Sequence, residues 1–200
     1  LPGGTAPFRF VNGGDMGVED FVVPLLTLAG QTDPDFAIIG GDIAYVNGLL
    51  GWYSEWDKWL DNWDNHMVTT DGRMIPIVTA IGNHETNRFA TDDPKLNAPW
   101  YTSLFGRQGE HIYYTRNFGD NFAFISLDTG HLTPYEGAQT EWLAEVLKKN
   151  EAKKYKFAAY HIPLYPVPTK GLSPRWAASI GVPSSTNTDS PWGWSTMTTC

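Results

Sequence analysis

Three short apolar runs in the first half of the chain each end in glycine and are followed at once by polar side chains. Their length and their glycine boundaries predict buried β-strands. The runs span residues 8–12, 36–39 and 74–81. The polar residues that follow them are Asp15, Asp42, Asn83 and His84. Because ligands of open α/β sheets bind at the carboxyl ends of the strands, this repeated pattern predicts a binding site at one edge of a sheet.

In the segments between these runs, the apolar residues recur with helical spacing. Residues 19–30 carry an apolar face and stop at a glycine, which predicts a short helix. Residues 52–67 carry tryptophans at positions i, i+4, i+7 and i+11, which predicts a helix with one buried aromatic face. These tryptophans are Trp52, Trp56, Trp59 and Trp63. An exposed aromatic platform for a sugar is the alternative, which helical spacing favours less.

The second half of the chain predicts a hairpin, a helix and a further strand. Residues 86–109 are polar and contain prolines, which predicts a long loop of the kind that packs over a site. The later elements are expected at residues 112–116 and 121–127 (hairpin), 137–150 (helix) and 155–160 (strand). The last strand ends at His161, and residues from 171 onward predict loop. The fold class is therefore α/β, with mixed β-sheets flanked by helices.

The charge balance bears on the possible partners. The chain has 200 residues, enough for one domain, with 14 basic and 22 acidic residues and a net charge of −8. This balance disfavours nucleic-acid binding, which needs clustered Lys and Arg, but bound metal ions can still supply local positive charge to a phosphate ester. No apolar run reaches the ~20 residues of a membrane span. The single cysteine, Cys200, cannot form an internal disulfide, so it is free or pairs outside this chain.

The polar residues at the strand ends are of metal-ligating types. Asp15, Asp42, Asn83 and His161 offer carboxylate, amide and imidazole donors that suit Fe, Zn and Mn. A carboxylate can bridge two ions ~3.5–4 Å apart, and a phenolate such as that of Tyr45 can bind trivalent iron. Taken one at a time, such an aspartate is more often a turn residue than a ligand, and a lone histidine is usually structural.

Four ordered sequence blocks resemble those of purple acid phosphatases within the calcineurin-like metallophosphoesterases. The resemblance extends from about Arg9 to about Tyr165 and includes a strand end at 127–129 and the helix around Gln139. The blocks are Gly14-Asp15-Met16-Gly17, Gly41-Asp42-Ile43-Ala44-Tyr45, Gly82-Asn83-His84-Glu85 and Tyr160-His161-Ile162-Pro163-Leu164-Tyr165. The resemblance implies a partial four-layer α-β-β-α sandwich.

The resemblance also implies a role for each matching residue. Asp15 and Tyr45 would bind Fe(III), Asp42 would bridge it to a divalent Fe, Zn or Mn ion, and Asn83 and His161 would bind that second ion. The tyrosine separates the purple type from the wider superfamily.

His84 is expected to have a different role, because the resemblance places it beside the phosphate rather than on a metal. There it would donate a proton to the leaving alkoxide. Gly17 stands where many other members of the superfamily have a histidine ligand, which agrees with the purple type.

The chain departs from the family pattern after the fourth block. The fifth block, G-H-x-H, supplies one histidine to each metal in the family and does not occur here. The segment Gly130-His131-Leu132-Thr133 begins like it, but it precedes the fourth block and is interpreted as a loop. Lys170 stands where larger members have histidines near the substrate, and either contacts phosphate or belongs to a solvated loop.

These departures lead to expectations about the whole protein. Residues 1–7 resemble a linker after an upstream β-sandwich domain, and residues 8–200 resemble a catalytic domain that is incomplete at its C-terminus. A second chain or a further segment would supply the G-H-x-H ligands. The expected function is metal-dependent hydrolysis of a phosphomonoester. The alternatives are a phosphodiesterase and a catalytically incomplete structural or interaction protein. The resemblance also implies a secreted or extracytoplasmic location.

Overall fold

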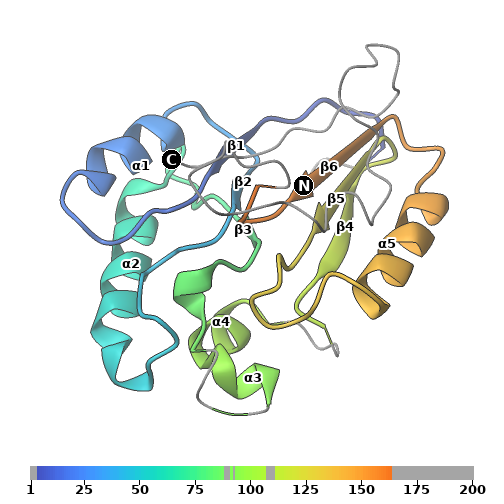
Figure 1. Cartoon of the computed structure of the whole chain (residues 1–200). Helices are drawn as coiled ribbons and strands as arrows, with labels where there is room; N and C mark the ends of the chain where they lie inside the picture. The colour runs from blue at the N-terminus through green and yellow to red at the C-terminus, as the bar shows by residue number, and fades with distance from the viewer. Residues whose placement is uncertain (1–3, 88–90, 92, 107–110, 164–200) are drawn as a thin grey trace.

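Two three-stranded sheets pack face to face in the computed structural model (Figure 1). The first sheet is parallel, with the order β1-β2-β3, and the second has the order β4-β5-β6, with β4 antiparallel and β6 parallel to β5. The strands are β1 (Phe10–Gly13), β2 (Phe36–Ile39), β3 (Ile77–Thr79), β4 (Tyr114–Phe118), β5 (Phe122–Ser126) and β6 (Tyr155–Ala159). The structure describes residues 4–87, 91, 93–106 and 111–163.

Helices cover the outer faces of both sheets (Figure 1). Helices α1 (Val22–Gly30) and α2 (Tyr53–His66) pack on the first sheet, and α5 (Ala138–Lys149) packs on the second. The layers therefore follow the order α-β-β-α, which confirms the predicted fold class. The short helical segments are η1 (Leu50–Trp52), η2 (Asn83–Glu85), α3 (Pro94–Asn97) and α4 (Pro99–Leu104). No helix in the described ranges has both the length and the apolar character needed to cross a membrane.

Strand β2 shows why the layers form, because its residues are buried on both faces. Ala37 and Ile39 pack with the helices α1 and α2, whereas Phe36 and Ile38 pack with the second sheet. The ring of Phe36 stacks on that of Phe118 with 4.3 Å between centroids, which joins the two sheets. Near-continuous apolar runs of this kind are typical of parallel strands covered on both sides.

The predicted burial of the tryptophan face of α2 is confirmed for three of the four tryptophans. Trp56, Trp59 and Trp63 are buried, and the Trp63 indole N–H donates to the Ile75 carbonyl at 3.1 Å. Trp52 is 50% exposed and belongs to η1, so its prediction as part of the buried face was wrong. Its backbone dihedral angles (φ −100°, ψ 37°) are not those of an α-helix, and α2 begins only at Tyr53.

The segment predicted as one long loop contains two short helices, α3 and α4. Pro99 is the first residue of α4, a position where the fixed φ of proline favours helix formation. The sequence predicts a loop here because the segment is polar, although Pro99 is also a signal for the start of a helix. Lys170 and Cys200 lie outside the described residues.

Candidate metal centre

The carboxyl ends of the three parallel strands bring the first three sequence blocks together. After β1 and β2 the chain continues as two paired loops, in which the Asp15 amide donates to the Gly41 carbonyl (3.1 Å) and the Gly17 amide to the Ile43 carbonyl (2.9 Å). The loop after β3 begins at Gly82 and forms η2. All three polar segments thus lie at one edge of the sheet, as the sequence predicts.

Two glycines allow the loops after β2 and β3 to approach each other. Gly41 has φ +99°, and a Cβ added there would lie 2.6 Å from the backbone nitrogen of Gly82. A Cβ added to Gly82 would in turn overlap the carboxylate of Asp42. Both positions therefore require glycine, and substitution would push the loops apart.

Strained backbone conformations gather at this edge of the sheet. Five non-glycine residues in the described ranges have positive φ, and four of them belong to these loops: Asp15 (47°), Asp42 (53°), Tyr45 (56°) and Asn47 (53°). Such conformations cost about 1–3 kcal/mol each and accumulate at functional sites. The strain at these four residues therefore points to a site rather than to simple turns.

The imidazole of His161 joins the last predicted block to the others. Its Nδ1 lies 3.1 Å from the Gly40 carbonyl, which can only accept, so Nδ1 carries a proton. Its Nε2 lies 3.3 Å from Asp42 Oδ2 and 3.0 Å from Asn83 Oδ1. A histidine held through one ring nitrogen by a carbonyl, with the other nitrogen turned toward acidic and amide oxygens, is the usual arrangement of a metal ligand.

Asp15 and Tyr45 form the other side of this cluster. The Tyr45 hydroxyl donates to Asp15 Oδ1 at 3.2 Å. Asp15, Asp42 and His161 each present one ligand atom, and these three atoms lie within 4.8 Å of one another. Burial raises the pKa of Tyr45, and the negative charges of Asp15 and Asp42 raise it further. Without a cation the phenol therefore stays protonated.

Asp42 and His161 form a charged pair in the absence of a metal. Burial alone would raise the pKa of Asp42, but the hydrogen bonds from His161 and the His84 amide and the charges of both imidazoles hold it below its usual value. Burial likewise opposes a charged His161, but the hydrogen bond to Asp42 and the charges of Asp42 and Asp15 raise its pKa. The cluster thus attracts positive charge, which a proton on His161 or a metal cation can supply.

His84 lies beside this cluster. Its Nε2 is 3.8 Å from Asp42 Oδ2, and its ring packs on the ring of Tyr45 with 4.3 Å between centroids. Its Nδ1 lies 2.6 Å from Asn47 Oδ1. The backbone N–H of Asn47 donates to the backbone carbonyl of His84 at 2.7 Å. Asn47 therefore fixes the direction of the ring. The sequence offered no signal for this role, because Asn47 precedes a glycine and reads as a turn residue.

Glu85 connects two of the loops through three charge-assisted hydrogen bonds. Its fully buried carboxylate accepts from the amides of Asp42 (2.8 Å), Ile43 (2.7 Å) and Gly82 (2.8 Å). Burial raises its pKa to about 7, and the charge of Asp42 adds to this while the three amides oppose it. The family resemblance implies no role for Glu85. The signal present in the sequence is an acidic residue directly after two predicted site residues.

Replacing Glu85 with Gln should destabilise the protein by about 1–3 kcal/mol, because the amide group cannot accept all three N–H donors. Thermal denaturation would show this as a loss of several degrees in Tm. Glu19→Gln is the matched control, since the exposed Glu19 carboxylate accepts a single amide from the described residues, that of the neighbouring Val18. Equal Tm values for the two variants would show that Glu85 does not connect the loops.

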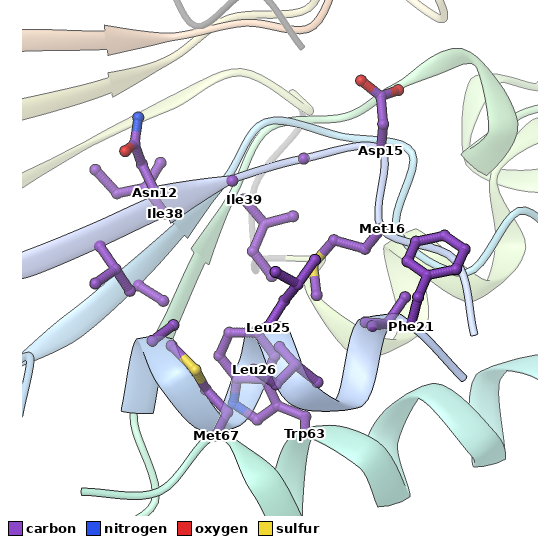
Figure 2. Close-up of a pocket in the computed structure, with 16 residues that line it drawn as sticks. Asn12, Asp15, Met16, Phe21, Leu25, Leu26, Ile38, Ile39, Trp63 and Met67 are labelled. Carbon is purple, nitrogen blue, oxygen red and sulfur yellow. The ribbon is translucent and has the colours of Figure 1, made fainter. Parts of the chain in front are cut away.

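An apolar groove of about 290 Å³ adjoins the cluster on the side of β1 and α1. Figure 2 shows Asp15 at its rim pointing away from the apolar side chains, with Phe21 and Leu25 of the α1 region on the opposite wall. Phe21 is 63% and Leu25 60% exposed. Leu25 was predicted on the apolar face of this helix, and in the described part of the chain that part of the face is not covered.

Comparison with known proteins identifies the family. The sequence model of the calcineurin-like phosphoesterase family matches residues 14–182. The chain belongs to this family. The match includes all four sequence blocks and extends past the last described residue. No curated protein sequence matches the chain significantly.

Solved structures of other phosphoesterases share the fold of this family member. A purple acid phosphatase from seeds of yellow lupin (Lupinus luteus) superposes with a TM-score of 0.58 over 79% of the chain, at 19% identity. A dimetal phosphatase from Danio rerio superposes with a TM-score of 0.54 over 80% of the chain, at 15% identity. The matched part is 31% of the lupin chain and 71% of the Danio rerio chain.

In this calcineurin-like phosphoesterase all six residues predicted for the site lie together. The side chains of five of them form one cluster, in which each lies next to at least one other member, and the sixth side chain lies beside this cluster. They are Asp15, Asp42, Tyr45, Asn83 and His161, with His84 alongside. Their roles as ligands and acid remain predictions.

Proposed function

We propose that the chain carries most of the active site of a metal-dependent phosphomonoesterase of the purple acid phosphatase type. The observation that carries this proposal is the convergence of Asp42 Oδ2, Asn83 Oδ1 and His161 Nε2, with Asp15 and its partner Tyr45 on the adjoining side. Oxygen and nitrogen ligand atoms gathered in this way, on strained backbone, are suited to hold a metal cation between them. Membership in the calcineurin-like phosphoesterase family supports the same reaction class.

The donor atoms fit two different ions. Asp15 and Tyr45 would hold a ferric ion, because phenolate and carboxylate are hard anionic ligands. Burial and the charges of Asp15 and Asp42 raise the pKa of Tyr45, so only a strongly charged cation would displace its proton. Asn83 and His161 would hold a divalent Fe, Zn or Mn ion. Asp42 lies between the two groups and would bridge them.

The ions would supply charge for the phosphoryl oxygens and would activate a water molecule for attack on phosphorus. The residues of the chain would do the rest of the chemistry. Asn47 holds Nδ1 of His84, so the proton available for catalysis is the one on Nε2. His84 would donate this proton to the leaving oxygen as the ester bond breaks, because an alkoxide is otherwise a poor leaving group.

We further propose that ligands from outside the described residues complete the site. The described part of the chain contributes five ligand side chains, fewer than two six-coordinate ions need. Among the described residues, β1 is an edge strand beside the groove at Asp15, so another strand and helix would fit there. A further segment or a second chain with a G-H-x-H block fits this place. Residues 8–200 would then be part of a longer catalytic domain, and residues 1–7 would be a linker to an upstream β-sandwich domain. Secretion of the protein is a separate proposal that rests on the family resemblance.

Metal removal tests the proposal. With the segment or chain that completes the site present, the protein should hydrolyse p-nitrophenyl phosphate when loaded with Fe(III) and Zn(II), lose this activity on treatment with a chelator, and regain it when the ions are restored. A parallel assay with bis(p-nitrophenyl) phosphate separates monoesterase from diesterase activity. Hydrolysis that survives complete metal removal would contradict the proposal. A metal-loaded protein without turnover would favour a structural or interaction role.

A further inference from the structure

The loop after β5 is an ordered unit that the proposed reaction does not itself require. It is built around Asp128, whose buried carboxylate accepts backbone N–H groups from His131 (2.8 Å), Leu132 (2.9 Å) and Thr133 (2.6 Å). The side chain of Gln139 in α5 binds the Asp128 backbone at both its N–H (2.8 Å) and its carbonyl (2.9 Å). A loop with this many hydrogen bonds is held in one conformation, so the residues that it presents are held as well.

This loop presents Thr129 and His131 to the segment that carries His161. The Thr129 hydroxyl accepts the Ile162 amide N–H at 3.1 Å and pairs with His131 Nε2 at 3.1 Å. The rings of His131 and His161 lie 5.5 Å apart between centroids. Both Thr129 and His131 are buried. The segment Gly130-His131, which is predicted as a loop, therefore lies next to His161, a predicted metal ligand.

His161 needs such support because it lies beyond the end of the sheet. The register of β5 and β6 ends at the pair Ser126 and Ala159, and the Leu127 amide makes one further bond to the Ala159 carbonyl (3.0 Å). From there His161 is held on one side by the bond from its Nδ1 to Gly40. The Thr129 hydroxyl holds the backbone on the other side, one residue after the imidazole.

We propose that Thr129 is a positioning residue for His161, and that His131 orients the Thr129 hydroxyl. The proposal rests on the proposed function, because it takes His161 as a metal ligand. Thr129 does not touch the ion or the substrate. It sets where the His161 imidazole points, so its loss should weaken binding of the divalent ion by roughly 10–100-fold, the range for groups that orient a ligand.

The test is Mn(II) binding to the full chain, followed by the electron paramagnetic resonance signal of the free ion. Thr129→Val keeps the shape and removes the hydroxyl, and is expected to raise the Kd of the His161-dependent site. Thr129→Ser keeps the hydroxyl and should restore binding close to that of the unsubstituted chain. Thr115→Val is the matched control, because its hydroxyl donates to a strand carbonyl, that of Phe124 (2.8 Å), and should leave Mn(II) binding unchanged.

The outcomes separate the two proposals. If His161→Ala loses Mn(II) binding but Thr129→Val binds as tightly as the unsubstituted chain, the positioning role is overturned and the proposed function stands. If His161→Ala has no effect on Mn(II) binding, His161 is not a metal ligand and the proposed function is contradicted. Should Thr129→Val not fold, hydrogen exchange in the unsubstituted chain gives the answer: the Ile162 amide is expected to be protected, and free exchange would overturn the proposal.

Discussion

Replacing Asp42 with Asn will remove metal from the site and lower phosphomonoesterase activity by roughly 10³-fold or more. The substitution keeps the shape of the side chain but removes the charge that faces His161, and Asp42 is the residue proposed to bridge the two ions. Bound metal ions contribute several kcal/mol to transition-state stabilisation, and each 1.36 kcal/mol corresponds to a factor of ten in rate. Elemental analysis of the purified variant measures the metal content, and steady-state kinetics measure the rate.

Asp33 provides a matched control for this substitution. It too has a positive φ (52°), and its carboxylate accepts the Thr70 amide at 2.7 Å. Asp33→Asn therefore makes the same chemical change at a similar strained position outside the site, and it should retain metal and activity. An Asp42→Asn variant with the metal content of Asp33→Asn would show that Asp42 is a turn residue and not a ligand.

Replacing His84 with Ala should lower kcat by roughly 10²–10⁴-fold, the range for loss of a general acid, while metal content stays nearly unchanged. The reason is geometric: Nδ1 is held by Asn47, and Nε2 lies beside Asp42 at 3.8 Å, farther than the Nε2 of His161. The loss should be smaller for p-nitrophenyl phosphate than for an alkyl phosphate, because an acidic leaving group needs little protonation. Kinetics with both esters measure this difference.

His111→Ala serves as the control for His84→Ala. His111 is exposed, stacks on Tyr113 and should have no effect on turnover. Loss of metal from the His84→Ala variant would identify His84 as a ligand and would contradict its assignment as the acid.

Much of the fold was predictable because the strands of the first sheet lie in short, mostly apolar segments that are followed by glycine. Strand β2 is the clearest case, since all four of its residues are buried between two layers. Boundaries were less predictable where tertiary contacts decide them. Trp52 continues the spacing of the α2 tryptophans but lies in η1, half exposed, because the helix begins one residue later. Spacing alone does not reveal where a helix starts.

The site was predictable where its residues lie in contiguous blocks at strand ends. Asp15, Asp42 and Asn83 follow neighbouring parallel strands, so their proximity follows from the topology. The supporting residues were not predictable in this way. Asn47 and Thr129 act through hydrogen bonds to residues 37 and 33 positions away, and these contacts depend on how the loops fold back. Glu85 binds across 42–43 residues for the same reason.

Anomalous diffraction from crystals of the metal-loaded protein tests the central claim most directly. The account predicts two anomalous peaks ~3.5–4 Å apart. The Asp42 carboxylate should lie between them, with Asp15 and Tyr45 on one ion and Asn83 and His161 on the other. Data collected on both sides of the iron edge would assign the Tyr45 site to iron. A fully loaded protein with no peak at Asp42, or with a single ion that leaves either group of ligands empty, would contradict the binuclear centre.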